Sequence, residues 1–143
     1  CSYVLGIGRS AVRQSVADRF DSRKFRARTL VHPAATMGAD VTIGKGSVIC
    51  AGARIDNNVR IGRHSHINHN TIIGHEAILG DFVSMSPLAA VAADCIIHDG
   101  VLVGLSGVVL NGLTVGGGAT VGACACVTKD VPPGVIVKGI PAR

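Results

Sequence analysis

Aliphatic side chains recur at every sixth position of this chain from residue 31 onward. An α-helix needs a period near 3.6 and a half-buried strand a period of 2, so neither element alone explains this spacing. The period instead predicts a solenoid in which each hexad forms one short strand and a corner. The aliphatic positions are Val31, Met37, Ile43, Ile49, Ile55, Ile61, Ile67, Ile73, Leu79, Met85, Val91, Ile97, Val103, Val109, Val115, Val121 and Val127.

A second set of residues, four positions after each aliphatic one, is mostly small or β-branched, as at Ala53, Val59 and Ala77. The position directly after the aliphatic one is often Gly, as at Gly74 and Gly80. Three hexads close a triangular coil of about 18 residues, and both sets point inward. Aromatic rings would not fit so narrow a prism, and they make up only 3% of the chain. We therefore predict an all-β parallel β-helix.

The segment before the repeats has a different pattern. Residues 3–8 predict a short buried strand that ends in a Gly turn, and residues 9–20 predict a helix. The apolar stripe of this helix is Val12, Val16 and Phe20. Strand, Gly and helix together are typical of an α/β domain, and Gly6-x-Gly8 could approach a phosphate. Alternatively, the Gly pair is only a turn and the helix caps the open end of the solenoid.

The chain is basic, with a net charge of +5, and half of its 14 Lys and Arg residues lie within the first 28 positions. A basic balance favours an anionic partner such as a phosphorylated cofactor, although a charge run can also be a solvated face. We expect no nucleic-acid binding, because with three Phe, one Tyr and no Trp the chain lacks aromatic stacking platforms and no recognised module is present.

The five Cys residues are an odd number without the spacing of a disulfide framework. We expect reduced thiols in a cytoplasmic protein. A single Cys124-x-Cys126 pair is weak evidence for a metal site, so we expect no metal. No run approaches the about 20 apolar residues that cross a membrane.

The hexads resemble those of the hexapeptide-repeat acyltransferases, whose solenoid is a left-handed parallel β-helix. The tail Val137-x-Gly139-x-Pro141-Ala142-Arg143 resembles the C-terminal signature of the acetyltransferases in this group. The resemblance implies that acetyl-CoA is the co-substrate and that the tail lies near it. It also implies a homotrimer with active sites between neighbouring prisms. The tail can in addition protect the edge of the last coil.

Residues 67–82 and the stretch Leu30-Val31-His32-Pro33 resemble the sugar acetyltransferases that O-acetylate sialic acid or N-acetylate UDP-4-amino-sugars. That family has an N-terminal α/β half that holds the nucleotide-sugar and ends in a strand, a Gly and a helix carrying an Arg. Residues 3–20 match the end of that half. The resemblance divides the chain into a C-terminal remnant (strand-Gly-helix) of an α/β nucleotide-sugar-binding domain at 1–29, a left-handed β-helix acetyltransferase domain at 30–132, and an extended tail near coenzyme A at 133–143.

Carried onto this sequence, the resemblance makes His75 the general base and Glu76 the residue that raises its basicity. The acceptor must lose a proton as it attacks the thioester, and imidazole titrates near neutral pH. The developing oxyanion needs a backbone N–H donor. The resemblance assigns that donor to Ala93, one coil from His75, where the family usually has Gly.

The remaining site residues also follow from the resemblance. On the cofactor side, Ser84 stands where some members have a His that contacts the cofactor, and backbone groups of Leu105 and Ala123 match positions that hold the pantetheine arm. On the substrate side, Asn68 matches a polar position beside the base, and Gly8 matches a nucleotide-sugar contact. The acceptor is a small-molecule sugar or nucleotide-sugar, and the residues leave open whether an amine or a hydroxyl is acetylated.

Several alternatives stay open. Asn57 and Asn58, one coil from His75 and Glu76, are either substrate contacts or a corner asparagine ladder. A zinc enzyme like the γ-class carbonic anhydrases shares this solenoid, but the position where their pattern places a His is Gly80 here. A non-catalytic trimeric solenoid that serves as a scaffold is the other rival.

Overall fold

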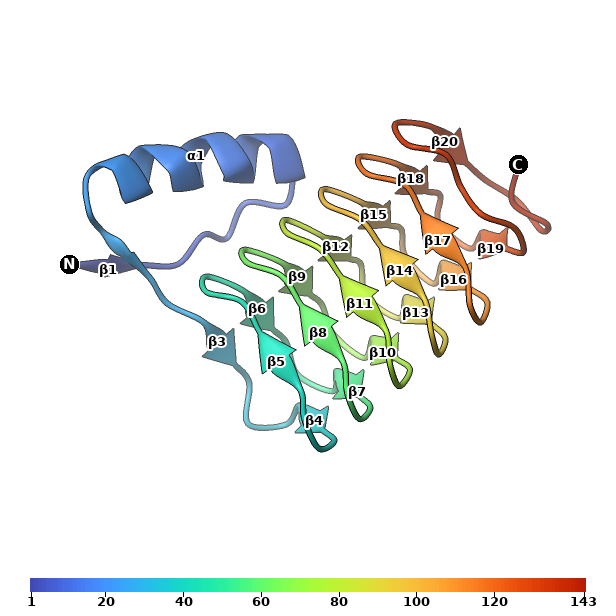
Figure 1. Ribbon diagram of the computed structural model, residues 1–143, viewed down its shortest axis with the longest axis horizontal. Coiled ribbons are helices and arrows are strands. Elements are labelled where there is room, and N and C mark those ends of the chain that lie inside the picture. Colours follow the sequence, from blue (N-terminus) through green and yellow to red (C-terminus); the bar gives the residue numbers. More distant parts are fainter.

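The structure is a computed structural model that describes residues 1–143, and it is a left-handed parallel β-helix with one helix beside it (Figure 1). Three parallel sheets form the faces of the prism. The six-stranded sheet contains, in spatial order, β19 (Cys126–Val127), β16 (Val108–Val109), β13 (Ala90–Val91), β10 (Ile72–Ile73), β7 (Arg54–Ile55) and β4 (Thr36–Met37).

The other two faces follow the same rule, so that every third strand along the chain joins the same sheet. The five-stranded sheet contains β17 (Thr114–Val115), β14 (Ile96–Ile97), β11 (Ile78–Leu79), β8 (Arg60–Ile61) and β5 (Thr42–Ile43). The seven-stranded sheet contains β20 (Ile136–Val137), β18 (Thr120–Val121), β15 (Leu102–Val103), β12 (Ser84–Met85), β9 (His66–Ile67), β6 (Val48–Ile49) and β3 (Leu30–Val31).

The core lies along the axis of the prism. In the pairing of β10 with β13, for example, Ile73 lies opposite Val91, so equivalent residues stack coil upon coil. All buried residues of the main core except Val137 occupy the two inward positions of the hexad period. The predicted solenoid and its inward positions are thus confirmed, and burial of Val, Ile, Leu and Ala supplies its apolar stabilisation.

The two ends of the solenoid differ. At the N-terminal end Val31 and Met37 are 42% and 41% exposed, so the first coil is open. At the C-terminal end the chain adds β20, in which Ile136 pairs with Thr120. The residues after β20 then cover β19, because the amide of Cys126 donates to Gly139 and its carbonyl accepts from Ala142. The tail therefore satisfies backbone groups of the last coil.

The N-terminal segment contains β1 (Ser2–Tyr3), α1 (Ser10–Ser22) and β2 (Arg26–Ala27), and β1 and β2 pair in parallel. A strand was predicted over residues 3–8, but the observed strand β1 covers only Ser2–Tyr3 and overlaps that range at Tyr3 alone. The helix lies along the side of the coils and not across their open end (Figure 1), so the capping alternative is wrong. It is too short to cross a membrane, and the chain has no other helix.

The predicted stripe of the helix holds at Val16 and Phe20, which pack against a small second core, but not at Val12. Val12 is exposed, and the fully buried residues of α1 are Arg13 and Ala17. Ala17 packs with Leu5 and Phe82 in a small second core between the helix and the solenoid. The helix therefore turns a mixed face to the coils, in which the buried Arg13 takes the place that the prediction gave to Val12.

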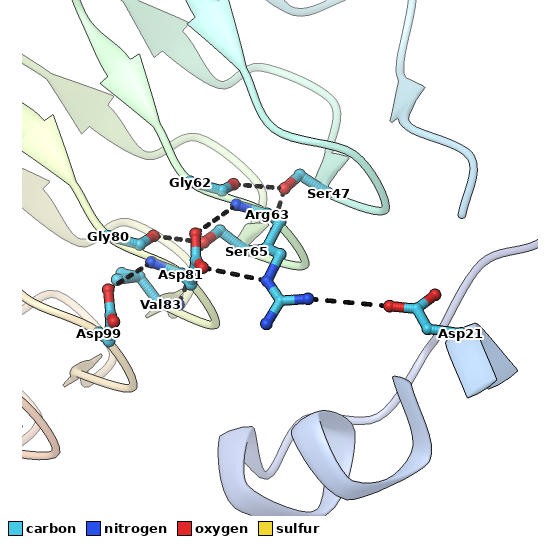
Figure 2. Close-up of polar contacts among 9 residues, drawn as sticks. All are labelled: Asp21, Ser47, Gly62, Arg63, Ser65, Gly80, Asp81, Val83 and Asp99. Atoms are coloured by element: carbon cyan, nitrogen blue, oxygen red, sulfur yellow. Dashed lines mark hydrogen bonds and ion pairs between the residues drawn. The ribbon is translucent and has the colours of Figure 1, made fainter. Parts of the chain in front are cut away.

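Polar side chains link the coils at the corner beneath the helix (Figure 2). Asp81 accepts a hydrogen bond from the Arg63 amide at 2.9 Å, and Asp99 accepts one from the Asp81 amide at 2.8 Å. Inside the corner, Ser65 donates to the carbonyl of Gly80 at 3.0 Å. These bonds satisfy backbone groups that the short strands leave unpaired.

The two faces of one strand give a direct test of this packing. Ile97 is 1% exposed and its neighbour Ile96 is 41% exposed. We expect Ile97→Ala to lower the free energy of unfolding by about 2–5 kcal/mol, because it leaves a cavity between coils. Ile96→Ala on the outer face is the matched control and should cost less than about 1 kcal/mol. Urea unfolding measures both, and equal losses would contradict the assigned faces.

Candidate active site

The candidate catalytic residues lie at the corner that follows the six-stranded sheet, which we call the first corner (residues 74–77, 92–95 and their equivalents). His75 and Ala93 hold equivalent places in adjacent coils, because Ile73 pairs with Val91. The Asp94 amide donates to the His75 carbonyl at 3.0 Å and joins the two turns. The imidazole of His75 is exposed on this corner.

The amide of Ala93 makes no hydrogen bond within the chain. The equivalent amide three coils earlier, at Ala39, is instead bonded by the Asn57 side chain at 2.8 Å. A Cβ on Gly74 would lie 2.6 Å from the Ala93 nitrogen, so Gly is required for the coils to stack here. The Ala93 N–H is thus a free donor one coil from His75, as an oxyanion site requires.

Glu76 is engaged by a residue of the preceding coil. Its Oε1 accepts a hydrogen bond from Asn58 Nδ2 at 2.6 Å, and no hydrogen bond joins Glu76 to His75. The residue has a positive φ of 60°, which places it at the turn of the corner. Asn57 bonds the Ala39 amide as described above, so both Asn57 and Asn58 link neighbouring coils, as the corner-ladder interpretation expects.

The candidate cofactor positions lie at a different corner, which follows the seven-stranded sheet and which we call the third corner. Leu105 and Ala123 hold equivalent places there, and neither amide makes a hydrogen bond within the chain. Asn68 belongs to the same corner, and its Nδ2 donates to the Met85 carbonyl at 2.7 Å. Asn68 precedes β10 and His75 follows it, so one chain does not bring the two side chains together.

Ser84 and Gly8 meet at the junction of helix and solenoid. Ser84 is 6% exposed, and its hydroxyl accepts a hydrogen bond from Arg13 Nη2 at 2.9 Å. The same hydroxyl lies 3.4 Å from the Gly8 carbonyl. Both residues line a groove of about 550 Å³ between the start of α1 and the seven-stranded sheet.

Within one chain the candidate residues therefore form three groups. His75, Glu76 and Ala93 lie at the first corner, Asn68, Leu105 and Ala123 at the third, and Ser84 with Gly8 beside the helix. No group of three or more His, Cys, Asp or Glu side chains that could hold a metal ion is found. Sequence reasoning assigned no role to Arg13, although the resemblance to the sugar acetyltransferases implies a helix that carries an Arg at this place.

Two histidines sit at the seam between the N-terminal segment and the coils. The His64 ring is buried and stacks between Tyr3 and Phe82, with centroid distances of 5.9 and 5.3 Å. His66 Nε2 lies 2.8 Å from the Leu5 carbonyl. Burial, reinforced by the nearby Arg13 cation, lowers the pKa of His66 to about 4, and burial also lowers the pKa of His64.

Solved structures of known proteins resemble this chain in fold and in sequence. The chain has 30% identity to the WeeI structure from Acinetobacter baumannii, with a TM-score of 0.97 over 99% of this chain and 69% of that one. The chain belongs to the hexapeptide-repeat, left-handed β-helix family of acetyltransferases. No protein-family model matches the sequence.

Other members of the hexapeptide-repeat family have been solved with ligands. A histidine mutant of perosamine N-acetyltransferase from Caulobacter crescentus, in complex with CoA and GDP-perosamine, has a TM-score of 0.97 and 27% identity, with coverage of 99% and 68%. The acetyltransferase domain of PglB from Neisseria gonorrhoeae, in complex with acetyl coenzyme A, has a TM-score of 0.74 and 27% identity over 98% of this chain and 68% of that one.

Among curated proteins, 2,3,4,5-tetrahydropyridine-2,6-dicarboxylate N-acetyltransferase of Staphylococcus aureus is 52% identical over 52 residues. That match spans 36% of this chain and only 22% of the staphylococcal enzyme.

The lowered pKa of His66 predicts that the free energy of unfolding depends on pH in the acidic range. The unfolded His66 takes up a proton near pH 6.5, but the folded one does so only near 4. Between these values the unfolded chain binds more protons, so the free energy of unfolding falls as the pH falls from about 6.5 to 4. We expect His66→Gln to reduce this slope in urea unfolding measured at several pH values. An unchanged slope would contradict a half-buried His66 that stays neutral above its lowered pKa.

Proposed function

We propose that this protein transfers the acetyl group of acetyl-CoA to an amino or hydroxyl group of a sugar, with a nucleotide-linked 4-amino-sugar as the first candidate and sialic acid as the second. The observation that supports this most is the His75 corner, where an exposed imidazole lies one coil from the free Ala93 amide. The structural relatives solved with CoA and GDP-perosamine support both the donor and the class of acceptor.

The chemistry assigned to each group is as follows. The acceptor nitrogen attacks the thioester carbon while His75 takes its proton, and the Ala93 N–H stabilises the oxyanion that forms. The C–S bond then breaks, the proton passes to the departing sulfur, and the products are the N-acetylated sugar and free CoA. Glu76, held by Asn58 at 2.6 Å, acts on His75 through its charge.

The remaining predicted residues divide between the two substrates. The unpaired amides of Leu105 and Ala123 would hold the pantetheine arm along the third corner. Ser84, for which the resemblance implies the cofactor side, lies beside the helix with Gly8, and we assign it to the acceptor side. Gly8, in the loop just before the N-terminus of α1, suits a nucleotide-sugar contact. Asn68 would lie next to the His75 of a neighbouring subunit.

This division favours a homotrimer. The third corner and the first corner flank the same six-stranded face, so a neighbouring prism can present its His75 to a pantetheine arm held on this one. A closed ring of three triangular prisms satisfies this arrangement for every subunit. We place the trimer in the cytoplasm, as the five free Cys residues favour.

Calorimetry tests whether acetyl-CoA binds as the acetyl donor. Steady-state kinetics tests whether His75 acts as the general base. We expect saturable binding near one acetyl-CoA per subunit, kept in His75→Ala. Turnover of the best UDP- or GDP-4-amino-sugar should fall by about 10²–10⁴-fold in this variant. Product should be followed by mass spectrometry, because thiol reagents would also label the exposed Cys1 and Cys124.

His98→Ala is the matched control, since His98 is exposed on a different corner and should leave turnover unchanged. Absence of acetyl-CoA binding at near-millimolar concentration would overturn the acetyltransferase proposal and favour the scaffold. Equal losses in both His variants would overturn the role of His75.

A further inference from the structure

Arg13 is the one charged residue in the interior of this protein. It is 0% exposed, and burial lowers the pKa of its guanidinium to about 10, so it stays cationic at neutral pH. No carboxylate pairs with it, because both ion pairs of the chain involve Arg63. A buried cation is costly unless hydrogen bonds surround it.

The three nitrogens of Arg13 bond two separate parts of the molecule. Nη1 donates to the carbonyls of Ile7 at 2.6 Å and Gly8 at 3.0 Å, in the loop before α1. Nε donates to the His64 carbonyl at 2.8 Å, and Nη2 to the Phe82 carbonyl at 2.9 Å, both on the solenoid. The guanidinium therefore clamps the loop to two successive coils.

Ser84 extends this clamp. Its hydroxyl accepts from Arg13 Nη2 at 2.9 Å and faces the Gly8 carbonyl at 3.4 Å. The side chain thus touches both the cation and the loop that the cation holds. Ser10 adds a weaker link from the first turn of α1, with its hydroxyl 3.3 Å from the Gly100 carbonyl.

The clamp sets the width of the groove beside it. One wall of this groove is the loop and the first turn of α1, from Ile7 to Val12, and the other wall includes Gly100, Leu102, Gly118 and Thr120. The loop itself forms no strand and no helix. Leu5 anchors its start in the small second core, and Arg13 holds its Ile7 and Gly8 carbonyls. Release of the guanidinium would let the wall that carries Gly8 move away from the solenoid.

We propose that Arg13 and Ser84 are positioning residues that hold the Gly8 loop against the solenoid and thereby keep the acceptor groove at its binding width. This inference rests on the proposed function, in which Gly8 contacts the nucleotide-sugar. Neither residue transfers a proton or touches the thioester in this assignment. The guanidinium spreads its N–H donors over three nitrogens, which reach the loop and both coils at once. A lysine at this position has only one nitrogen and cannot hydrogen-bond to both the loop and the coils.

The kinetic test separates acceptor binding from donor binding. With the best-turned-over UDP- or GDP-4-amino-sugar, we expect Ser84→Ala to raise the acceptor KM about 3–10-fold and Arg13→Lys about 10–100-fold, since hydrogen bonds to a charged group are lost. The acetyl-CoA Kd and kcat at saturating acceptor should change less than about threefold. Arg19→Lys is the control, because Arg19 is exposed on the same helix. It should leave the acceptor KM, the acetyl-CoA Kd and kcat unchanged.

Hydrogen exchange makes the test independent of any acceptor. In the protein without ligand, we expect amides of residues 7–12 to exchange faster in Arg13→Lys, with Ser84→Ala intermediate and the distant β16–β19 coils unchanged. Faster exchange in a protein that acetylates no sugar would keep the clamp and overturn the proposed function. Unchanged exchange and unchanged acceptor KM would overturn the positioning role, as would an equal loss of acceptor and acetyl-CoA affinity.

Discussion

The stacking of inward aliphatic residues coil upon coil is the constraint on which the rest of this structure depends. Ile73 pairs with Val91, and the next coil repeats the pairing at Val109, so every corner is fixed in place by the strands on either side of it. Corner residues consequently form columns along the prism. The register of the strands alone therefore fixes which residue of the next coil lies beside a given corner side chain, even where the two make no contact. His75 and Ala93 are related in this way.

The N-terminal segment is attached by a different kind of interaction. A small apolar core there contains Leu5 and Ala17 of this segment and Phe82 of the solenoid, and Tyr3, Val16 and Phe20 pack against it. The buried Arg13 cation adds hydrogen bonds to carbonyls of the solenoid, beside the stacked rings of Tyr3, His64 and Phe82. This seam depends on protonation state and hydrogen-bond geometry, whereas the solenoid depends on side-chain volume.

The sequence predicted the solenoid well, because its period is local and each hexad repeats the same inward pattern. It predicted the N-terminal segment poorly, since the buried face of α1 is set by a corner far away in sequence, and Arg13 took the place of Val12 there. The resemblance named the corner residues. It could not show that Glu76 bonds Asn58, nor that Asn68 lies at the other end of β10 from His75.

A crystal structure of this protein with CoA tests the central claim most directly, which is that each site is shared between two prisms. The account predicts a trimer in which the pantetheine arm lies along Leu105 and Ala123 of one subunit. Its sulfur should end within reach of His75 and of the Ala93 amide of the neighbouring subunit. A CoA held by one isolated chain, or one whose sulfur lies far from every His75, would contradict it.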